Sequence, residues 1–268
     1  MVLEQFIDRE LVTKHFTFVL LLSALFVFVS YGVYALFFPT QSVTIILLAT
    51  ILLVPSMHHL IVIEEKVERT GSKQFLARHK TIIRCYLGAF CGLVLGFLIL
   101  GALVPETIHY QASELEQTQL RPELIANFGN FEPTTQTALA VFTHNLQFLI
   151  IGFFLAIFYG AGAIFIVAYT ASFFSAFILE LSARFSNAPL LGGVALIHLV
   201  PENAGFLLAA IAGATLSRAL IHEKLSGQPF KNVLQNVFLL LVIGIGLLLA
   251  AAFIETYGTA VIFQKLIV

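Results

Sequence analysis

The stretch of residues 142–218 decides the fold. It opens as FTHNLQF (142–148), continues through two long apolar runs joined at YGAGA (159–163), and ends as IHLVPENAGFLLAAIAGATLSR (197–218). The apolar runs are about 20 residues long, which is the length of an α-helix that crosses a bilayer, whereas a transmembrane β-strand needs only about 9–11 residues. The stretch therefore predicts membrane-spanning helices, and its polar residues lie in or beside hydrocarbon.

The composition of the whole chain agrees with this prediction. Of its 268 residues, 59% are hydrophobic and 11% are charged, and the mean hydropathy is +0.96. Soluble domains carry roughly 25% charged residues, so this chain cannot cover a water-facing surface. The formal net charge of −1 gives no indication of nucleic-acid binding. We predict an integral membrane protein in contact with the lipid bilayer and without a nucleic-acid partner.

Seven apolar runs have the length of spanning helices. They occupy residues 16–38, 42–63, 82–104, 138–159, 161–182, 198–221 and 232–254. The first run lacks a small-residue cleavage site and is interpreted as a retained helix. Residues 185–197, with Pro189 and paired glycines, are too short to span and predict a loop or a re-entrant segment. Residues 1–15 and 255–268 are expected at the interface, the former as an amphipathic helix.

These runs predict an all-α polytopic membrane helix bundle that forms a single membrane domain over residues 1–268. Its N-terminal part (1–104) holds three helices. A polar extracytoplasmic segment (105–137), rich in glutamate and proline, is expected to cap the bundle. It is too short for an independent domain. The remaining residues, 138–268, form the core that carries the polar side chains.

The distribution of lysine and arginine predicts the orientation. With seven spans and a cytoplasmic N-terminus, the cytoplasmic side holds Arg9, Lys14, Lys66, Arg69, Lys73, Arg78, Lys80, Arg84, Arg218, Lys224 and Lys231. The other side holds only Arg121, Arg184 and Lys265. Basic residues accumulate in cytoplasmic segments. We therefore predict a multi-pass protein of the cell membrane, with the N-terminus cytoplasmic and the C-terminus extracytoplasmic.

Small residues recur every four positions in several helices. The glycines on these faces and in the hairpin turn are Gly88, Gly92, Gly96, Gly152, Gly160, Gly162, Gly205 and Gly213. Such faces let helix backbones approach closely. They predict helix packing either within the bundle or between subunits, so a homo-oligomer remains one of the two alternatives. The helix with Gly205 and Gly213 carries the longest small face and is predicted to be the most buried.

Four polar residues converge in this topology. The fourth and sixth helices both begin on the external side, so His144 and Asn145 are predicted at a depth similar to that of His198 and Glu202, near the external leaflet. His198 and Glu202 are one turn apart on one face. Arg218 falls at the cytoplasmic end of the same helix. An ionisable group within hydrocarbon is costly and usually has a partner or a role.

Three interpretations of this cluster remain open. It ties two helices together through hydrogen bonds, it titrates in transport or proton relay, or its two histidines and one glutamate bind a metal such as zinc. No metal-ligand set and no cofactor is assigned. No His-Glu-x-x-His motif and no activated nucleophile is present, so no catalytic residue is predicted. An intramembrane hydrolase would require the cluster to hold a metal and a water.

The order of these motifs resembles the stage II sporulation protein M family. The signature of that family begins with His-Asn at the head of a membrane helix, here His144 and Asn145, followed by a glycine-containing hairpin. A later histidine with a glutamate four residues on, here His198 and Glu202, opens a helix of small residues that ends in arginine, here Arg218. The motifs that carry the resemblance cover about residues 140–221, and the resemblance can extend over the core at 138–268 or the whole chain.

One departure concerns proline. The family often has His-Gly-Val-Leu-Glu-Leu-Pro where this chain has His198-Leu-Val-Pro-Glu202-Asn-Ala, so the proline stands three residues earlier. The resemblance implies a non-enzymatic scaffold or anchor for a membrane or cell-envelope complex, with other membrane or envelope proteins as partners. The alternative is a small transporter or channel that uses the His/Asn/Glu cluster.

Overall fold

The computed structural model describes residues 16–38, 42–69, 75–118, 132–158, 162–184 and 188–267. The long helices are α3 (Phe16–Phe37), α4 (Val43–Arg69), α5 (Phe75–Leu103), α8 (Thr135–Phe158), α9 (Gly162–Arg184), α10 (Ala188–His222) and α11 (Gln228–Ile254). The shorter elements are the 3-10 helix η1 (Pro105–Ile108), α6 (His109–Thr118), the π-helical turn η3 (Glu255–Thr259) and α12 (Ala260–Ile267). The described residues contain no strand, and the predicted all-α bundle is confirmed. The amphipathic helix predicted over residues 1–15 lies outside the described residues.

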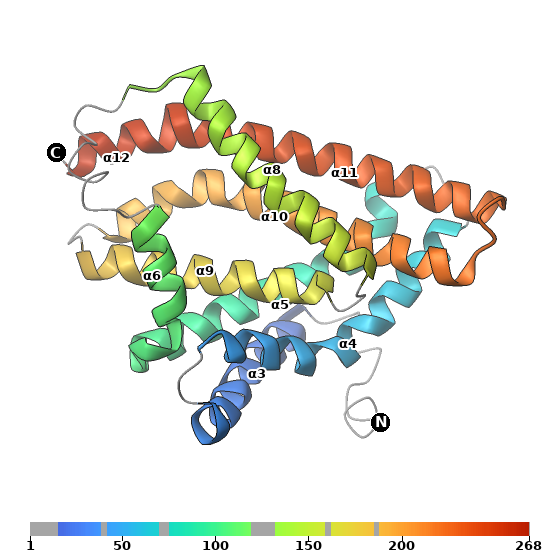
Figure 1. The fold of residues 1–268 in the computed structure, drawn as a ribbon, viewed down its shortest axis with the longest axis horizontal. Helices are drawn as coiled ribbons and strands as arrows, with labels where there is room; N and C mark the ends of the chain where they lie inside the picture. The colour runs from blue at the N-terminus through green and yellow to red at the C-terminus, as the bar shows by residue number, and fades with distance from the viewer. Residues whose placement is uncertain are drawn as a thin grey trace.

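Helix α10 is a centre of packing in the bundle. Figure 1 shows α9, α10 and α11 running lengthwise through the molecule and α8 running obliquely across it, and α10 contacts α8, α9, α11 and α4. Among the residues that the structure describes, six stretches are long and apolar enough to cross a membrane: Phe16–Phe37, Ile83–Leu103, Thr135–Phe158, Gly162–Arg184, Leu190–His222 and Gln228–Leu266. Of these six, Leu190–His222 is the most buried, as predicted.

Helix α4 is the seventh predicted span. Its apolar part within the described side chains, Val43–Pro55, is shorter than the other six. The helix nevertheless packs against α3, α5, α9, α10 and α11, so it lies within the bundle. Its passage across the membrane therefore stays a prediction.

The re-entrant segment predicted at 185–197 is wrong for the residues described there. Residues 188–197 are the first ten of the 35-residue helix α10, which continues without a break to His222. Pro189 falls in the first turn, where proline is tolerated. The paired glycines do not interrupt the helix, because a broken backbone in hydrocarbon would leave polar groups without partners.

The predicted end of the seventh helix at residue 254 is wrong, whereas the interfacial position of residues 255–268 stays a prediction. These residues continue α11 through η3 into α12, and the apolar stretch Gln228–Leu266 is 39 residues long. The sequence ETYGT is typical of a helix end, but here it forms a π-helical turn and the helix continues beyond it. Consequently Glu255 lies within a long helix and not at its edge.

The polar segment after α5 packs deeply into the bundle. Helix α6 lies against α9 (Figure 1), and the buried Gln111 amide donates a hydrogen bond of 3.3 Å to the Ser172 hydroxyl, ten residues into α9. Ile108 and Leu115 join a hydrophobic cluster with residues of α9, α10 and α12, including Phe263. The expected cap is therefore partly an internal element.

The small-residue faces are used inside the bundle. A Cβ at Gly96 would lie 2.9 Å from Val27 of α3, and one at Gly205 would lie 2.9 Å from the carbonyl oxygen of Gly244 in α11. Gly92 and Gly88 likewise face α3, Gly152 faces Ile166 of α9, and Gly213 faces Phe153 of α8. Gly162 packs against Leu155 at the hairpin, while Gly160 lies outside the described residues. The described glycines among them lie at close helix contacts, and Gly205 brings α10 and α11 close together.

Candidate ion-binding site

Helix α10 supplies a buried histidine and a glutamate one turn later. His198 is 7% exposed, and Glu202 is partly buried. Pro201 stands between them inside the helix. Because proline has no backbone N–H, the carbonyl of Ile197 loses its usual helical donor, and the helix is loosened at the level of the two side chains.

The turn η3 supplies a second glutamate and a threonine. Glu255 begins this π-helical turn and Thr259 ends it, so both come from the irregular part of the α11–α12 helix. The turn is held against α8 by a hydrogen bond of 3.2 Å between the hydroxyls of Thr135 and Tyr257. A π-helical turn inside an α-helix often marks a functional position.

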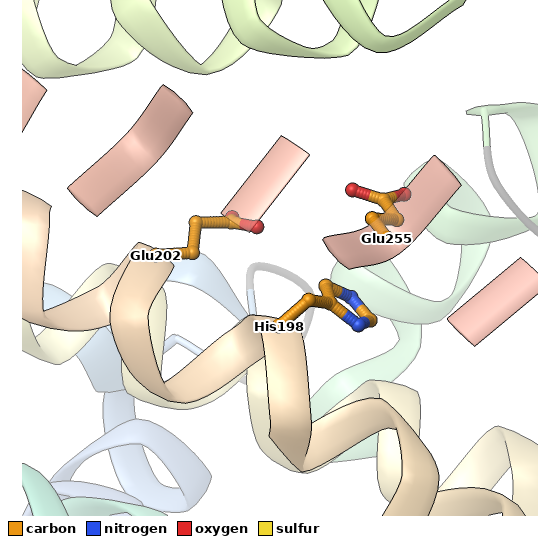
Figure 2. A group of neighbouring side chains, drawn as sticks. All are labelled: His198, Glu202 and Glu255. Atoms are coloured by element: carbon orange, nitrogen blue, oxygen red, sulfur yellow. The ribbon is translucent and has the colours of Figure 1, made fainter. Parts of the chain in front are cut away.

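The three ionisable side chains converge on one point. One ligand atom each of His198, Glu202 and Glu255 lies within 4.8 Å of the other two. Figure 2 shows the two carboxylates pointing toward one another, with the His198 ring beside Glu255. The Nδ1 atom of His198 lies 3.0 Å from the Thr259 hydroxyl oxygen. This contact holds the ring at Nδ1, and no protein partner of its other nitrogen is found among the described residues.

Helix α8 completes the site with Asn145. This residue is buried, and its side chain lies beside the Glu202 carboxylate. Among the described residues, no lysine or arginine pairs with Glu202 or Glu255. The two acids therefore face each other without a basic partner, and both keep part of their surface accessible.

The site lies deep along the helices. Asn145 is ten residues into α8, and His198 and Glu202 are ten and fourteen residues into α10. Glu255 is twelve residues before the end of α12. At 1.5 Å per residue these positions are about 15–21 Å from helix ends, whereas the hydrocarbon core is about 30 Å thick. The cluster is thus farther from the helix ends than predicted, because α8 and α10 begin earlier than the sequence suggested.

His144 and Arg218 do not belong to this group. The His144 side chain is exposed, and its ring packs edge-on against Phe148 of the same helix with a centroid distance of 5.0 Å. Arg218 is partly buried near the last turn of α10, sixteen residues beyond Glu202, as predicted for a helix end. Of the four residues predicted to form the cluster, the structure brings together Asn145, His198 and Glu202.

Sequence reasoning missed Glu255 and Thr259. Between Lys231 and Lys265, Glu255 is the only charged residue in the sequence. A single carboxylate so far from any other charge in an apolar run is the signal that could have found it. It was assigned to the interface because the run was expected to end at residue 254. Thr259 offered no comparable signal.

Comparison with known proteins identifies the family. The profile of the family described as Stage II sporulation protein M matches residues 85–260. Neither the curated proteins nor the solved structures return a match. The matched region begins in α5 and contains Asn145, His198, Glu202, Glu255 and Thr259, so it includes the motifs at 140–221 and extends beyond them on both sides. With six helices able to span a bilayer among its described residues and a family match over more than half of its length, the chain is an integral membrane protein of the stage II sporulation protein M family.

Proposed function

We propose that this protein is a small transporter or channel that moves a cation or proton past the His198–Glu202–Glu255 group. One observation supports this most strongly: two carboxylates from different helices face each other in mid-bundle without a basic partner. Two negative charges this close repel strongly in a low-dielectric medium. The pair of carboxylates therefore requires a positive counter-charge, either a bound cation or a proton.

The helix geometry at the site favours movement of that charge. Both contributing helices depart from regular α-helix there, α10 at Pro201 and the α11–α12 helix at η3. Transporters commonly place ion sites near mid-membrane on interrupted helices, because irregular backbone offers free carbonyls and allows local movement. A purely structural clasp would need neither the second carboxylate nor its partial exposure.

Reconstitution into liposomes tests this proposal. The full chain is placed in phosphatidylglycerol-containing vesicles loaded with a proton-sensitive or a divalent-cation-sensitive dye. We expect flux with the wild type and its loss in Glu202→Gln and Glu255→Gln, which keep the side-chain shape and remove the charge. Glu180→Gln, which removes an ion pair with Arg184 at the end of α9, is the matched control. Unchanged flux in Glu202→Gln would contradict the proposal that this protein is a transporter or channel.

A non-enzymatic scaffold or anchor for a membrane or cell-envelope complex is the second candidate. The observation in its favour is the outer face of α8, the least buried of the six spanning stretches. Phe148, Ile151, Phe154 and Phe158 are exposed on it. The glycine faces that first suggested partner contacts are occupied within the bundle, so a partner or a second copy would have to use such an outer face.

Site-specific photo-crosslinking separates the two candidates. A photoreactive residue at Ile151 should crosslink a specific protein, or a second copy of this chain, if the scaffold proposal is correct. The same residue placed at Ala89, a fully buried position on α5, is the control that should crosslink only within the chain. Adducts with lipid alone at Ile151 count against a scaffold that uses α8.

For the orientation, we propose a cytoplasmic N-terminus and an extracytoplasmic C-terminus in the cell membrane. The proposal rests on the eleven-to-three distribution of lysine and arginine. In this orientation α8 and α10 begin on the external side. The site formed with Asn145, His198 and Glu202 would then be approached from that side.

A further inference from the structure

We propose that His198, Glu202 and Glu255 bind one divalent transition-metal ion, with Zn²⁺ as the representative. The inference uses the same side chains as the proposed function, but it concerns binding and not movement. The ligand atoms come from two helices that are far apart in sequence, and they already lie within 4.8 Å of one another. Zinc bound at about 2.0–2.2 Å separates tetrahedral ligands by about 3.5 Å, so modest rotation of the partly exposed glutamates closes the site.

The histidine is prepared for a metal by its neighbour. Its side chain is 7% exposed, and its Nδ1 atom is engaged by Thr259 at 3.0 Å. When Nδ1–H donates to the threonine oxygen, Nε2 carries the lone pair. No protein partner of Nε2 is found among the described residues, and the ring lies beside Glu255 (Figure 2). A metal-bound histidine typically has its second nitrogen held in this way.

The charge balance favours a divalent ion. Two carboxylates and a neutral imidazole carry a charge of −2, which a divalent cation cancels, and no basic side chain of the described residues competes for them. The imidazole disfavours Mg²⁺ and Ca²⁺, which prefer oxygen ligands alone. Three protein ligands leave a fourth tetrahedral position for water or another small ligand.

Asn145 has a supporting position. It lies beside the Glu202 carboxylate on a third helix, α8, where its carboxamide can donate a hydrogen bond to a carboxylate oxygen. Such a bond orients a ligating oxygen and leaves the second oxygen of the carboxylate for the ion. Asn145 and Thr259 are therefore positioning residues for Glu202 and His198, respectively.

Zinc binding by the full-length protein tests the inference. The protein is purified in detergent, stripped with a chelator, and titrated with Zn²⁺ by calorimetry, with metal content checked by mass spectrometry. We expect one zinc per chain. His198→Ala, Glu202→Gln and Glu255→Gln should each weaken binding by more than about 100-fold. Asn145→Ala and Thr259→Val should weaken it by about 10–100-fold, which is the usual cost of losing a partner of a ligand.

Two matched controls separate this site from surface binding. His144→Ala removes a histidine that faces away on α8, and Glu180→Gln removes a glutamate at the end of α9. Both should bind zinc as the wild type does. X-ray absorption should give a shell of nitrogen and oxygen only, at about 2.0–2.1 Å. A sulfur shell would assign the zinc to Cys85 or Cys91 and overturn the inference.

The outcomes distinguish this inference from the proposed function. Size-exclusion profiles and metal-free thermal unfolding show whether each variant is folded, and the glutamine variants preserve shape if His198→Ala does not fold. Zinc binding without flux supports this site and removes the transport proposal. Proton flux without zinc binding supports transport and overturns the metal site, because the carboxylate pair then holds only a proton. Wild-type affinity in both Glu202→Gln and Glu255→Gln also overturns it.

Discussion

At the scale of single residues, the two glutamates have unequal support. Glu202 has the Asn145 side chain beside it, whereas no protein partner of Glu255 is found among the described residues. Adjacent residues also have different fates: Asn145 faces the site while His144 faces outward. Consecutive helix positions point about 100° apart, so the sequence alone could place the pair in the right helix but could not tell which member faces inward.

The metal-free protein should be more stable with Glu255→Gln than with the native residue. The substitution removes one of two facing acids and keeps the side-chain shape, so we expect a gain of about 0.5–2 kcal/mol, as is common when a functional site is relaxed. Thermal unfolding in detergent with a chelator measures it. Zinc should stabilise the wild type and leave the variant unaffected. A lower unfolding temperature for the chelated variant would show that Glu255 has a stabilising role.

At the scale of elements, the site depends on two irregular helices held at close range. The loosening at Pro201 and the turn η3 occur at the same level of the bundle, where His198 contacts Thr259. The α10–α11 crossing that brings them together is set by Gly205 and Gly244. Helix packing could be predicted from the glycine spacing, but the π-helical turn could not, since ETYGT reads locally as a terminator.

Deletion of Gly258 should convert the π-helical turn into ordinary α-helix. A π-helical turn holds one extra residue, so its loss rotates Thr259 by about 100° relative to α11 and takes it away from His198. We expect the helix content in circular dichroism to persist and zinc affinity to fall by about 10–100-fold. Gly258→Ala is the control, because the added Cβ would meet nothing nearer than Ile254 at 3.9 Å. Wild-type affinity in the deletion variant would argue against a role for the turn.

The α10–α11 crossing should be sensitive to a single methyl group. Gly205→Ala places a Cβ 2.9 Å from the Gly244 carbonyl oxygen, so we expect destabilisation by about 1–3 kcal/mol from overpacking. Gly246→Ala on the same α11 has no atom within 4 Å and should be neutral or stabilising by about 0.5–1 kcal/mol. Thermal unfolding of the two variants in one detergent compares them. Equal stability would mean that the helices can separate without cost.

At the scale of the whole molecule, most of the fold follows from hydrophobicity. In hydrocarbon every backbone group must be paired within its own helix, so long apolar runs predicted α3, α5, α8, α9 and α11 with small errors. The same rule explains the misses. The paired Gly192 and Gly193 and the polar start of 255–268 favour a helix end in water, but here α10 and the α11–α12 helix continue through them, and Pro189 stands in the first turn of α10. The site was only half predicted because one of its two helices was expected to end before Glu255.

The number of spans can be decided by the positions of the two termini. Seven spans place them on opposite sides of the membrane, whereas six, without α4, place them on the same side. We expect the first result, because α4 lies within the bundle against α9, α10 and α11, and lysine and arginine favour the cytoplasmic side of that topology. Epitope tags at the two ends, probed before and after permeabilisation, should show only the C-terminal tag accessible from outside.

Single cysteines test the same topology within the chain. In a background with Cys85 and Cys91 replaced by alanine, an impermeant maleimide should label Glu132→Cys, exposed before α8, on intact cells. Ser226→Cys, exposed between α10 and α11, should be labelled only after permeabilisation. Glu132 precedes the external end of α8, and Ser226 precedes the cytoplasmic end of α11 in this topology. Labelling of both positions from outside would therefore rule out this arrangement. The reverse pattern would invert the protein and open the His198–Glu202–Glu255 group toward the cytoplasm, with the bundle itself unchanged.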